Sequence, residues 1–216
     1  MIWGKRQQSM LWIVTYTPLL LIMIYRFIDA KDYFKRQKIF LWIANVVDKV
    51  IFDTLIVLII FFISWFFYKK ITNFYLSSLN TQLENGTDGS TVFVRKYNKL
   101  TANEYSFFLV TLLVPLVAID HSSIVNLLVT IIIISLAIII YVKTDYLVTC
   151  PIFFVSGYQV FRATISYGSR EDEQIDETLK KDVVILTKMR FLDLNNKFRV
   201  IRLVADIYYL VKEPNE

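Results

Sequence analysis

Four long apolar segments constrain the fold of this chain more than any other feature of its sequence. They cover residues 10–28, 51–68, 105–119 and 124–142, in a chain that is 56% hydrophobic and only 20% charged. An α-helix needs about 20 apolar residues to cross the roughly 30 Å hydrocarbon core of a bilayer. The last segment gives the clearest signal, because it carries no charged side chain. We therefore expect a membrane protein with a four-helix transmembrane bundle.

The first apolar segment has a second interpretation, because Lys5 and Arg6 precede it, as basic residues precede a cleaved signal peptide. The segment is long and aromatic, however, and the charged residues Arg26 near its end and Asp29 and Lys31 after it stand in place of a small-residue cleavage site. We interpret it as a retained transmembrane helix.

Residues 38–50 repeat apolar side chains at helical spacing, with Asn45, Asp48 and Lys49 on the opposite side. Such an amphipathic helix can lie flat in the membrane interface, or it can be the exposed start of the second span. The second alternative is slightly favoured, because the apolar sequence continues at Ile51 without a break.

The polar segment 69–104 separates the second and third spans. Its Asn-Gly pair at 85–86 and Asp-Gly pair at 88–89 are strong turn signals. Residues 91–97 have the composition of a β-strand, and residues 74–83 are a less certain partner strand. We therefore expect a β-hairpin in this loop.

The residues after the fourth span differ in character from those before them. Residues 158–165 alternate like a strand, an acidic run follows, and residues 182–188 and 199–211 are β-rich. The predicted fold class is a four-helix transmembrane bundle at 1–142 followed by a small cytoplasmic β-rich (α+β) domain at 143–216.

Basic residues indicate the orientation, because Lys and Arg are retained on the cytoplasmic side of a membrane. They are frequent in the N-terminal tail, the segment 69–104 and the C-terminal region, whereas the short loop 120–123 has none. The free thiol of Cys150 agrees with a reducing compartment. We expect a multi-pass membrane protein with both termini in the cytoplasm.

The sequence offers little to build an active site. With one cysteine, Cys150, and one histidine, His121, it cannot form a metal site of several Cys or His ligands, and we find no Gly-rich phosphate loop. Asp120 and His121 at the hairpin tip lack the nucleophile and oxyanion hole of a catalytic triad, so a polar helix cap is the simpler interpretation. We expect a protein that is not an enzyme and binds no cofactor, with Asp120 and His121 as candidates for outer-face sensing.

A cluster of cations on the expected strand is the best candidate for a binding surface. Such cations can contact anionic lipid or an acidic protein surface, and nucleic acid is the more specific interpretation. Cations beside a span are more often only its cytoplasmic flank. We choose protein binding and expect no direct contact with nucleic acid; the candidate partner-binding residues are Arg95, Lys96, Tyr97, Lys99 and Arg162.

Asp53 lies in the second span, and an acidic residue there raises the hypothesis of a channel or proton pathway. The interior of spans two to four carries no other charge, although an oligomer can build a pore from one residue per subunit. The alternative function is therefore a pore-forming or membrane-disrupting effector that a ligand gates through the cytoplasmic domain. A plain assembly subunit of another envelope complex is the third hypothesis.

The layout of the chain resembles the KwaA family, the membrane component of the Kiwa anti-phage system. The likeness is carried by Tyr-Thr-Pro-Leu-Leu-Leu at 16–21, by the Gly/Asp turn region, and by Cys150-Pro151 and Gly157-Tyr158 leading into a β-rich tail. The total length also fits.

This resemblance implies a sensor and scaffold of the bacterial inner membrane that detects a membrane perturbation on infection, and it would make the alternative pore a defence effector. It implies a cytoplasmic DNA-binding effector, KwaB, as the partner, contact with membrane lipid, and a homo-oligomer, expected to be a tetramer. No catalytic residue is carried over from the family.

Overall fold

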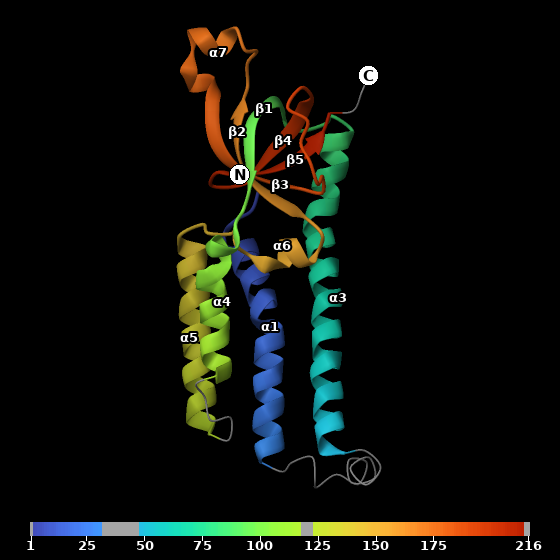
Figure 1. Cartoon of the computed structure of the whole chain (residues 1–216), viewed down its shortest axis with the longest axis vertical. Coiled ribbons are helices and arrows are strands. Elements are labelled where there is room, and N and C mark those ends of the chain that lie inside the picture. The colour runs from blue at the N-terminus through green and yellow to red at the C-terminus, as the bar shows by residue number, and fades with distance from the viewer. Residues whose placement is uncertain (1, 32–47, 118–122, 214–216) are drawn as a thin grey trace.

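The computed structural model describes residues 2–31, 48–117 and 123–213. Its long helices lie side by side, and a β-barrel sits at one end of them, at the top of Figure 1. The chain begins at the barrel end, passes through the helices and returns to finish in the barrel. The long helices are α1 (Lys5–Ala30), α3 (Lys49–Glu84), α4 (Ala102–Val117) and α5 (Ile124–Lys143).

Three of these helices are long and apolar enough to cross a membrane, namely α1, α3 and α5. They contain the expected spans at 10–28, 51–68 and 124–142. The expected span at 105–119 overlaps α4, of which the structure describes 16 residues, up to Val117, against the roughly 20 residues of a complete span. The helical arrangement is thus confirmed in part, with three candidate spans within the described residues where four were expected.

Helix α3 is longer than a membrane crossing, because its 36 residues continue well past Lys69 and Lys70. Residues 74–83, expected as a strand, belong to this helix, so the expected β-hairpin in 69–104 does not form there. The physical reason is that Leu76, Leu79 and Leu83 recur at helical spacing and are buried on one side of the helix. Of the expected amphipathic segment 38–50, residues 38–47 lie outside the described residues, and α3 begins at Lys49.

The barrel has five strands: β1 (Ser90–Lys99), β2 (Gln159–Ser166), β3 (Lys180–Thr187), β4 (Lys197–Val204) and β5 (Ile207–Lys212). They close in the order β1-β2-β3-β5-β4. Only the β3–β5 pair is parallel, and β1 pairs with both β2 and β4. This order and pairing are those of the five-stranded Greek-key barrels called OB-folds. The strands expected at 91–97, 158–165, 182–188 and 199–211 are all present, the last as the β4–β5 hairpin.

The barrel has its own apolar interior, filled by alternate side chains of each strand. Val92 and Val94 of β1, Phe161 of β2 and Ile185 of β3 are fully buried there. Because β1 comes before the third helix of the bundle, the barrel draws one strand from residues 1–142 and the other four from 143–216. The division into two domains at that boundary remains a prediction.

A second apolar cluster joins the barrel to the helices without interruption. It extends from Leu19 and Met23 of α1, through Leu79 and Leu83 of α3, to the outer side of the barrel at Tyr209. The short helix α6 (Pro151–Val155) contributes Ile152 and Phe153, and in Figure 1 it lies between the upper end of α1 and the middle of α3. The barrel is therefore packed directly on the helices that are candidates to cross the membrane.

Candidate functional site

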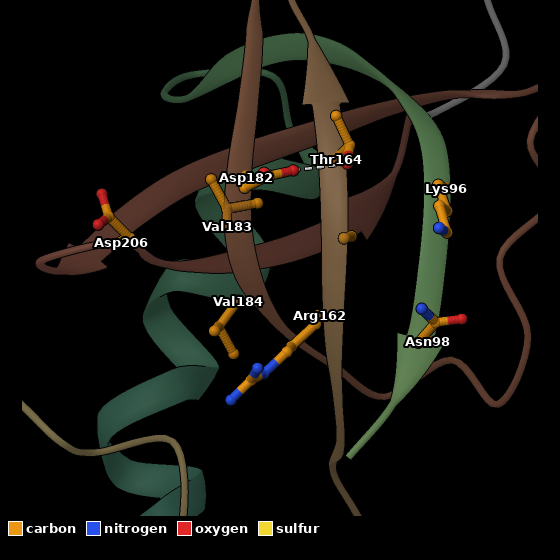
Figure 2. Close-up of a pocket in the computed structure, with 9 residues that line it drawn as sticks. Lys96, Asn98, Arg162, Thr164, Asp182, Val183, Val184 and Asp206 are labelled. Atoms are coloured by element: carbon orange, nitrogen blue, oxygen red, sulfur yellow. Dashed lines mark hydrogen bonds between the residues drawn. The ribbon is translucent and has the colours of Figure 1, made fainter.

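The outer surface of the barrel has a covered part and an open part. The side of β4 and β5 packs against the upper half of α3, and the N-terminal residues Ile2 and Trp3 donate backbone hydrogen bonds of 3.1 and 3.0 Å to the carbonyl of Leu203 on β4. The side formed by β1, β2 and β3 carries a groove with a volume of about 380 Å³ (Figure 2). This groove is the candidate functional site.

Strand register sets the floor of the groove as two rows of outward-facing residues. Lys96 of β1 lies opposite Thr164 of β2, which lies opposite Asp182 of β3. The second row is Asn98, Arg162 and Val184 on the same three strands. Residues on one face of a sheet alternate along each strand, which is why these positions face outward while their neighbours fill the barrel. Asp206, in the tight β4–β5 turn, also lines the groove.

The groove carries charges of both signs. The Thr164 hydroxyl donates a 2.6 Å hydrogen bond to the Asp182 carboxylate, which fixes one acidic group in the floor (Figure 2). Asp206 at the edge pairs with Lys181 at 2.8 Å, and this contact raises the pKa of the Lys181 ammonium. Among the described residues, no ion pair is formed by Lys96 or Asp182.

Arg162 connects the groove to the helical bundle. Its guanidinium forms a 2.7 Å ion pair with Glu104, in the first turn of α4, yet the arginine side chain remains 63% exposed. It can therefore contact a bound partner without leaving Glu104. The ion pair also places this end of the groove next to the first turn of α4.

The chemistry of the groove favours protein over nucleic acid. Barrels with this strand order bind oligonucleotides on the β2–β3 face, an analogy at the level of fold alone. Single-stranded nucleic acid is bound by aromatic platforms and a cationic track. Among the described residues, the side chains that line this groove include no aromatic ring, and the carboxylates of Asp182 and Asp206 would repel the phosphates of a nucleic acid. A polar surface with both charges suits a protein segment.

Of the five candidate partner-binding residues, the structure brings Lys96 and Arg162 together in the groove and directs the other three elsewhere. Tyr97 faces the barrel interior and meets Phe161 edge-on at 5.2 Å between ring centroids. Lys99 lies over the ring of Phe191 at 5.4 Å. A bulge between Val94 and Lys96 shifts the register of β1, so that the sequence alone does not reveal which side each residue faces.

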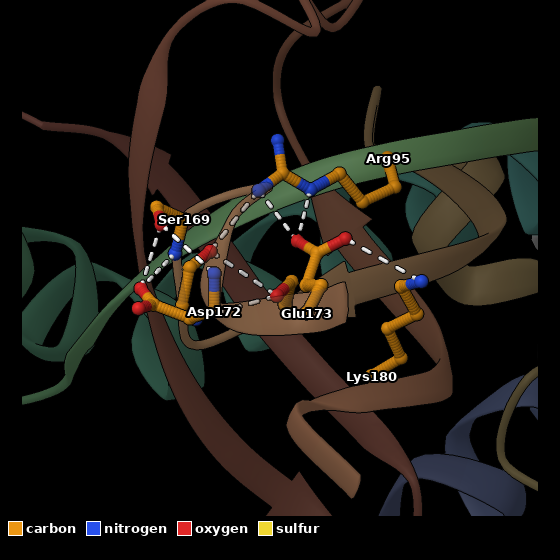
Figure 3. A network of polar contacts seen from close by, with 7 residues as sticks. Arg95, Ser169, Asp172, Glu173 and Lys180 are labelled. Carbon is orange, nitrogen blue, oxygen red and sulfur yellow. Dashed lines mark hydrogen bonds and ion pairs between the residues drawn. The ribbon is translucent and has the colours of Figure 1, made fainter. Parts of the chain in front are cut away.

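Arg95 has a structural role instead. It donates to the Glu173 carboxylate at 2.5 Å and to the Gly168 carbonyl at 3.0 Å, which fastens the loop around α7 (Asp172–Ile175) to β1 (Figure 3). Lys180 is a more distant second cation, at 3.6 Å from Glu173. The Ser166 hydroxyl and the Arg95 guanidinium together outweigh burial and hold the pKa of the Glu173 carboxyl below its ordinary value.

Several groove residues were not expected from the sequence, namely Asn98, Thr164, Asp182 and Asp206. The only sequence signal for Thr164 and Asp182 is their alternation with buried neighbours in two strands, and that signal does not say which strands pair. The outer-face candidates Asp120 and His121 lie outside the described residues.

Cysteine and metal chemistry receive no support from the described part of the chain. Cys150 is buried between α1 and α6, where its thiol meets the Thr15 hydroxyl at 3.2 Å, and burial raises its pKa to about 12. A thiol with so high a pKa is a poor nucleophile at neutral pH. Within the described ranges, no group of three or more His, Cys, Asp or Glu side chains is placed to hold a metal ion.

Comparison with known proteins identifies one family. The family described as anti-phage protein KwaA matches residues 7–209, which includes the bundle, the connecting helices and nearly all of the barrel. No curated protein and no solved structure matches the chain. The chain belongs to the KwaA family, as its sequence motifs suggested.

Proposed function

We propose that this member of the KwaA family is a membrane-anchored sensor and scaffold that detects a membrane perturbation on infection and recruits a soluble DNA-binding effector. The family supplies the setting, which is defence against phage. One structural observation supports the sensing role above all others. A single apolar cluster runs from the candidate spans α1, α3 and α5 to the outer side of the barrel. Because a protein interior is close-packed and nearly incompressible, a displacement of the membrane helices is transmitted through this cluster to the barrel.

The N-terminus strengthens this connection. Trp3 is hydrogen-bonded through its backbone to β4, and its ring stacks on Phe153 of α6 at 6.2 Å. Helix α1 starts two residues later, and Lys5 at its start bonds Asp145 at 2.7 Å, just after α5. A tilt or shift of α1 therefore acts on the barrel, α6 and the end of α5 together.

In the proposed arrangement, α4 crosses the bacterial inner membrane together with α1, α3 and α5. The barrel and both chain termini lie in the cytoplasm. The basic residues near the barrel end of the helices support this orientation. Helix α6 would then lie in the membrane interface, where Phe154, which is 67% exposed, contacts lipid.

The remaining parts of the proposal concern partners. Large apolar side chains on the span of α3, such as Phe61, Phe62 and Phe66, are more than half exposed and suit lipid or a second copy of the chain. We propose a homo-oligomer, with four copies as the expected number, and an effector of the KwaB type. The protein itself has no catalytic role in this proposal.

The test is to isolate the tagged, full-length protein in mild detergent from its native host and identify by mass spectrometry what accompanies it. A single soluble DNA-binding protein in a fixed ratio is expected. Recovery of the protein without any soluble partner, both before and after phage adsorption, would contradict the scaffold role.

A pore is the alternative function, and the described spans offer it a limited polar lining. Asp53 accepts a 2.5 Å hydrogen bond from Tyr25, so this carboxylate joins α3 to α1. Measurement of membrane potential in cells that overproduce the protein alone separates the two functions, since a pore predicts depolarisation and a scaffold predicts none.

A further inference from the structure

We propose that the groove on the β1–β2–β3 face binds an extended protein segment that carries an acidic and a basic side chain a few residues apart. The acidic residue would face Lys96 and Arg162, and the basic residue would face Asp182 and Asp206. This inference rests on the proposed scaffold function. It specifies the site at which the soluble partner binds and the charged side chains that the partner presents there.

The spacing of the charges supports a short segment. Lys96 and Asp182 stand two strands apart, on either side of Thr164, and neighbouring strands are about 4.8 Å apart. An extended chain advances about 3.3 Å per residue. Side chains two to four positions apart in such a segment therefore reach both charges at once when it runs across the strands.

The distribution of charges in the groove favours one orientation of the bound segment. The cation Lys96 lies on β1, and the carboxylates of Asp182 and Asp206 lie on β3 and in the β4–β5 turn (Figure 2). The other cation, Arg162, lies at the end next to α4, where it pairs with Glu104. Lys96 and Asp182 have no ion-pair partner in the described part of the chain, so each is available to a ligand of opposite charge. Complementary charges fix the orientation of a partner and exclude the reversed one.

The closed barrel excludes a second way of binding peptides. Each of its five strands pairs with two neighbours, so no strand offers a partner strand an edge that is unpaired along its whole length. Recognition therefore relies on side chains, and the short side chain of Thr164, between Lys96 and Asp182, leaves space for a partner side chain to enter.

The test exchanges the two free charges. Lys96→Asp combined with Asp182→Lys keeps the net charge of the protein and reverses the polarity of the groove. We expect this double variant to recover at least about tenfold less soluble partner from the native host, because each partner charge would meet a like charge. The matched control exchanges two neighbouring exposed charges on the α7 loop, Arg170→Glu with Glu171→Arg, and should recover as much partner as the unaltered protein.

A second readout identifies the ligand. A photoreactive benzoylphenylalanine at position 98, which lines the groove, should crosslink to a segment of the partner with acidic and basic residues within about four positions of each other. The same group at exposed position 170 should give no such adduct. Adducts with nucleic acid, or with lipid, would overturn the proposal.

The outcomes separate this inference from the function on which it rests. If the partner is recovered equally with the exchanged and unaltered grooves, the docking site is wrong and the scaffold function stands. If the unaltered protein recovers no soluble partner at all, both fail. Thermal unfolding of each purified variant, expected to match the unaltered protein within a few degrees, shows that loss of binding is not loss of folding.

Discussion

The Tyr209 hydroxyl on β5 donates a 2.9 Å hydrogen bond to the side-chain carbonyl of Asn80 on α3. Asn80 lies in the part of α3 beyond Lys69 and Lys70, and Tyr209 faces the outer side of the barrel, where its ring is fully buried. This contact joins the barrel to the same helix that contains the candidate span. It is a polar contact beside the apolar side chains, such as Leu79 and Leu83, that pack in the same interface.

Removal of this hydrogen bond should weaken the interface between the barrel and α3 without leaving a cavity in it. Tyr209→Phe keeps the ring and deletes the hydroxyl, so we expect the protein to lose about 0.5–1.5 kcal/mol of stability. Thermal unfolding in detergent measures this loss. Tyr146→Phe, at a tyrosine that is 39% exposed, is the matched control and should unfold at the temperature of the unaltered protein. Equal unfolding temperatures for all three would show that the Tyr209 contact contributes nothing.

The Arg95–Glu173 pair predicts a pH dependence. The pKa of Glu173 is lowered in the folded protein, so the ionised carboxylate adds stability above its ordinary pKa of 4.5, and this contribution disappears as the pH falls through the lower folded value. Glu173→Gln should unfold at a lower temperature than the unaltered protein at neutral pH, and the difference should close below about pH 4.5. Asp172 and Asp176 also have lowered pKa values, but they titrate in both proteins and cancel in the difference. A difference that stays constant with pH would show that charge is not what fastens the loop.

Cys150 should resist thiol reagents in the folded protein. Burial keeps the thiol protonated, with a pKa of about 12, and removes it from solvent. N-ethylmaleimide at neutral pH should therefore label the native protein slowly and the protein in dodecyl sulfate completely. Mass spectrometry of the intact chain measures both. Rapid labelling of the native protein would mean that the packing of α1 against α6 opens readily.

The exposed aromatic ring of α6 should contact lipid. We expect a nitroxide attached at Phe154→Cys, in vesicles, to be more accessible to oxygen than to a water-soluble nickel chelate, because oxygen concentrates in the bilayer. A nitroxide at Gln82→Cys, near the far end of α3, should show the opposite preference. The unreactive Cys150 makes both sites selective. If position 154 behaves like position 82, α6 does not lie at the membrane surface.

The sequence predicted the long apolar helices and the strands well, because both produce strong local periodicity. Helix α5 and strand β2 are examples, each found within a few residues of its expected bounds. Residues 74–83 were misassigned because Phe74, Tyr75 and the neighbouring apolar residues have high strand propensity, whereas packing against the barrel determines their helical state.

The groove could not be predicted from the sequence, for a different reason. It depends on the pairing of β1, β2 and β3, whose residues are separated by two long helices, and on a bulge that changes the facing of β1 after Val94. Lys96 and Arg162 were chosen for their charge alone. Asp182 completes the site only because the register places it opposite Thr164.

The most direct test of the account measures how much soluble effector sediments with the membranes before and after phage adsorption. The unaltered protein should show a clear change on adsorption, because α1 and the barrel move together. Trp3→Leu, which removes the ring stacked on Phe153 but keeps the site apolar, should reach the same protein level and show little change. An equal change in both proteins, or none in either, would contradict the claim that the barrel reports the state of the membrane helices.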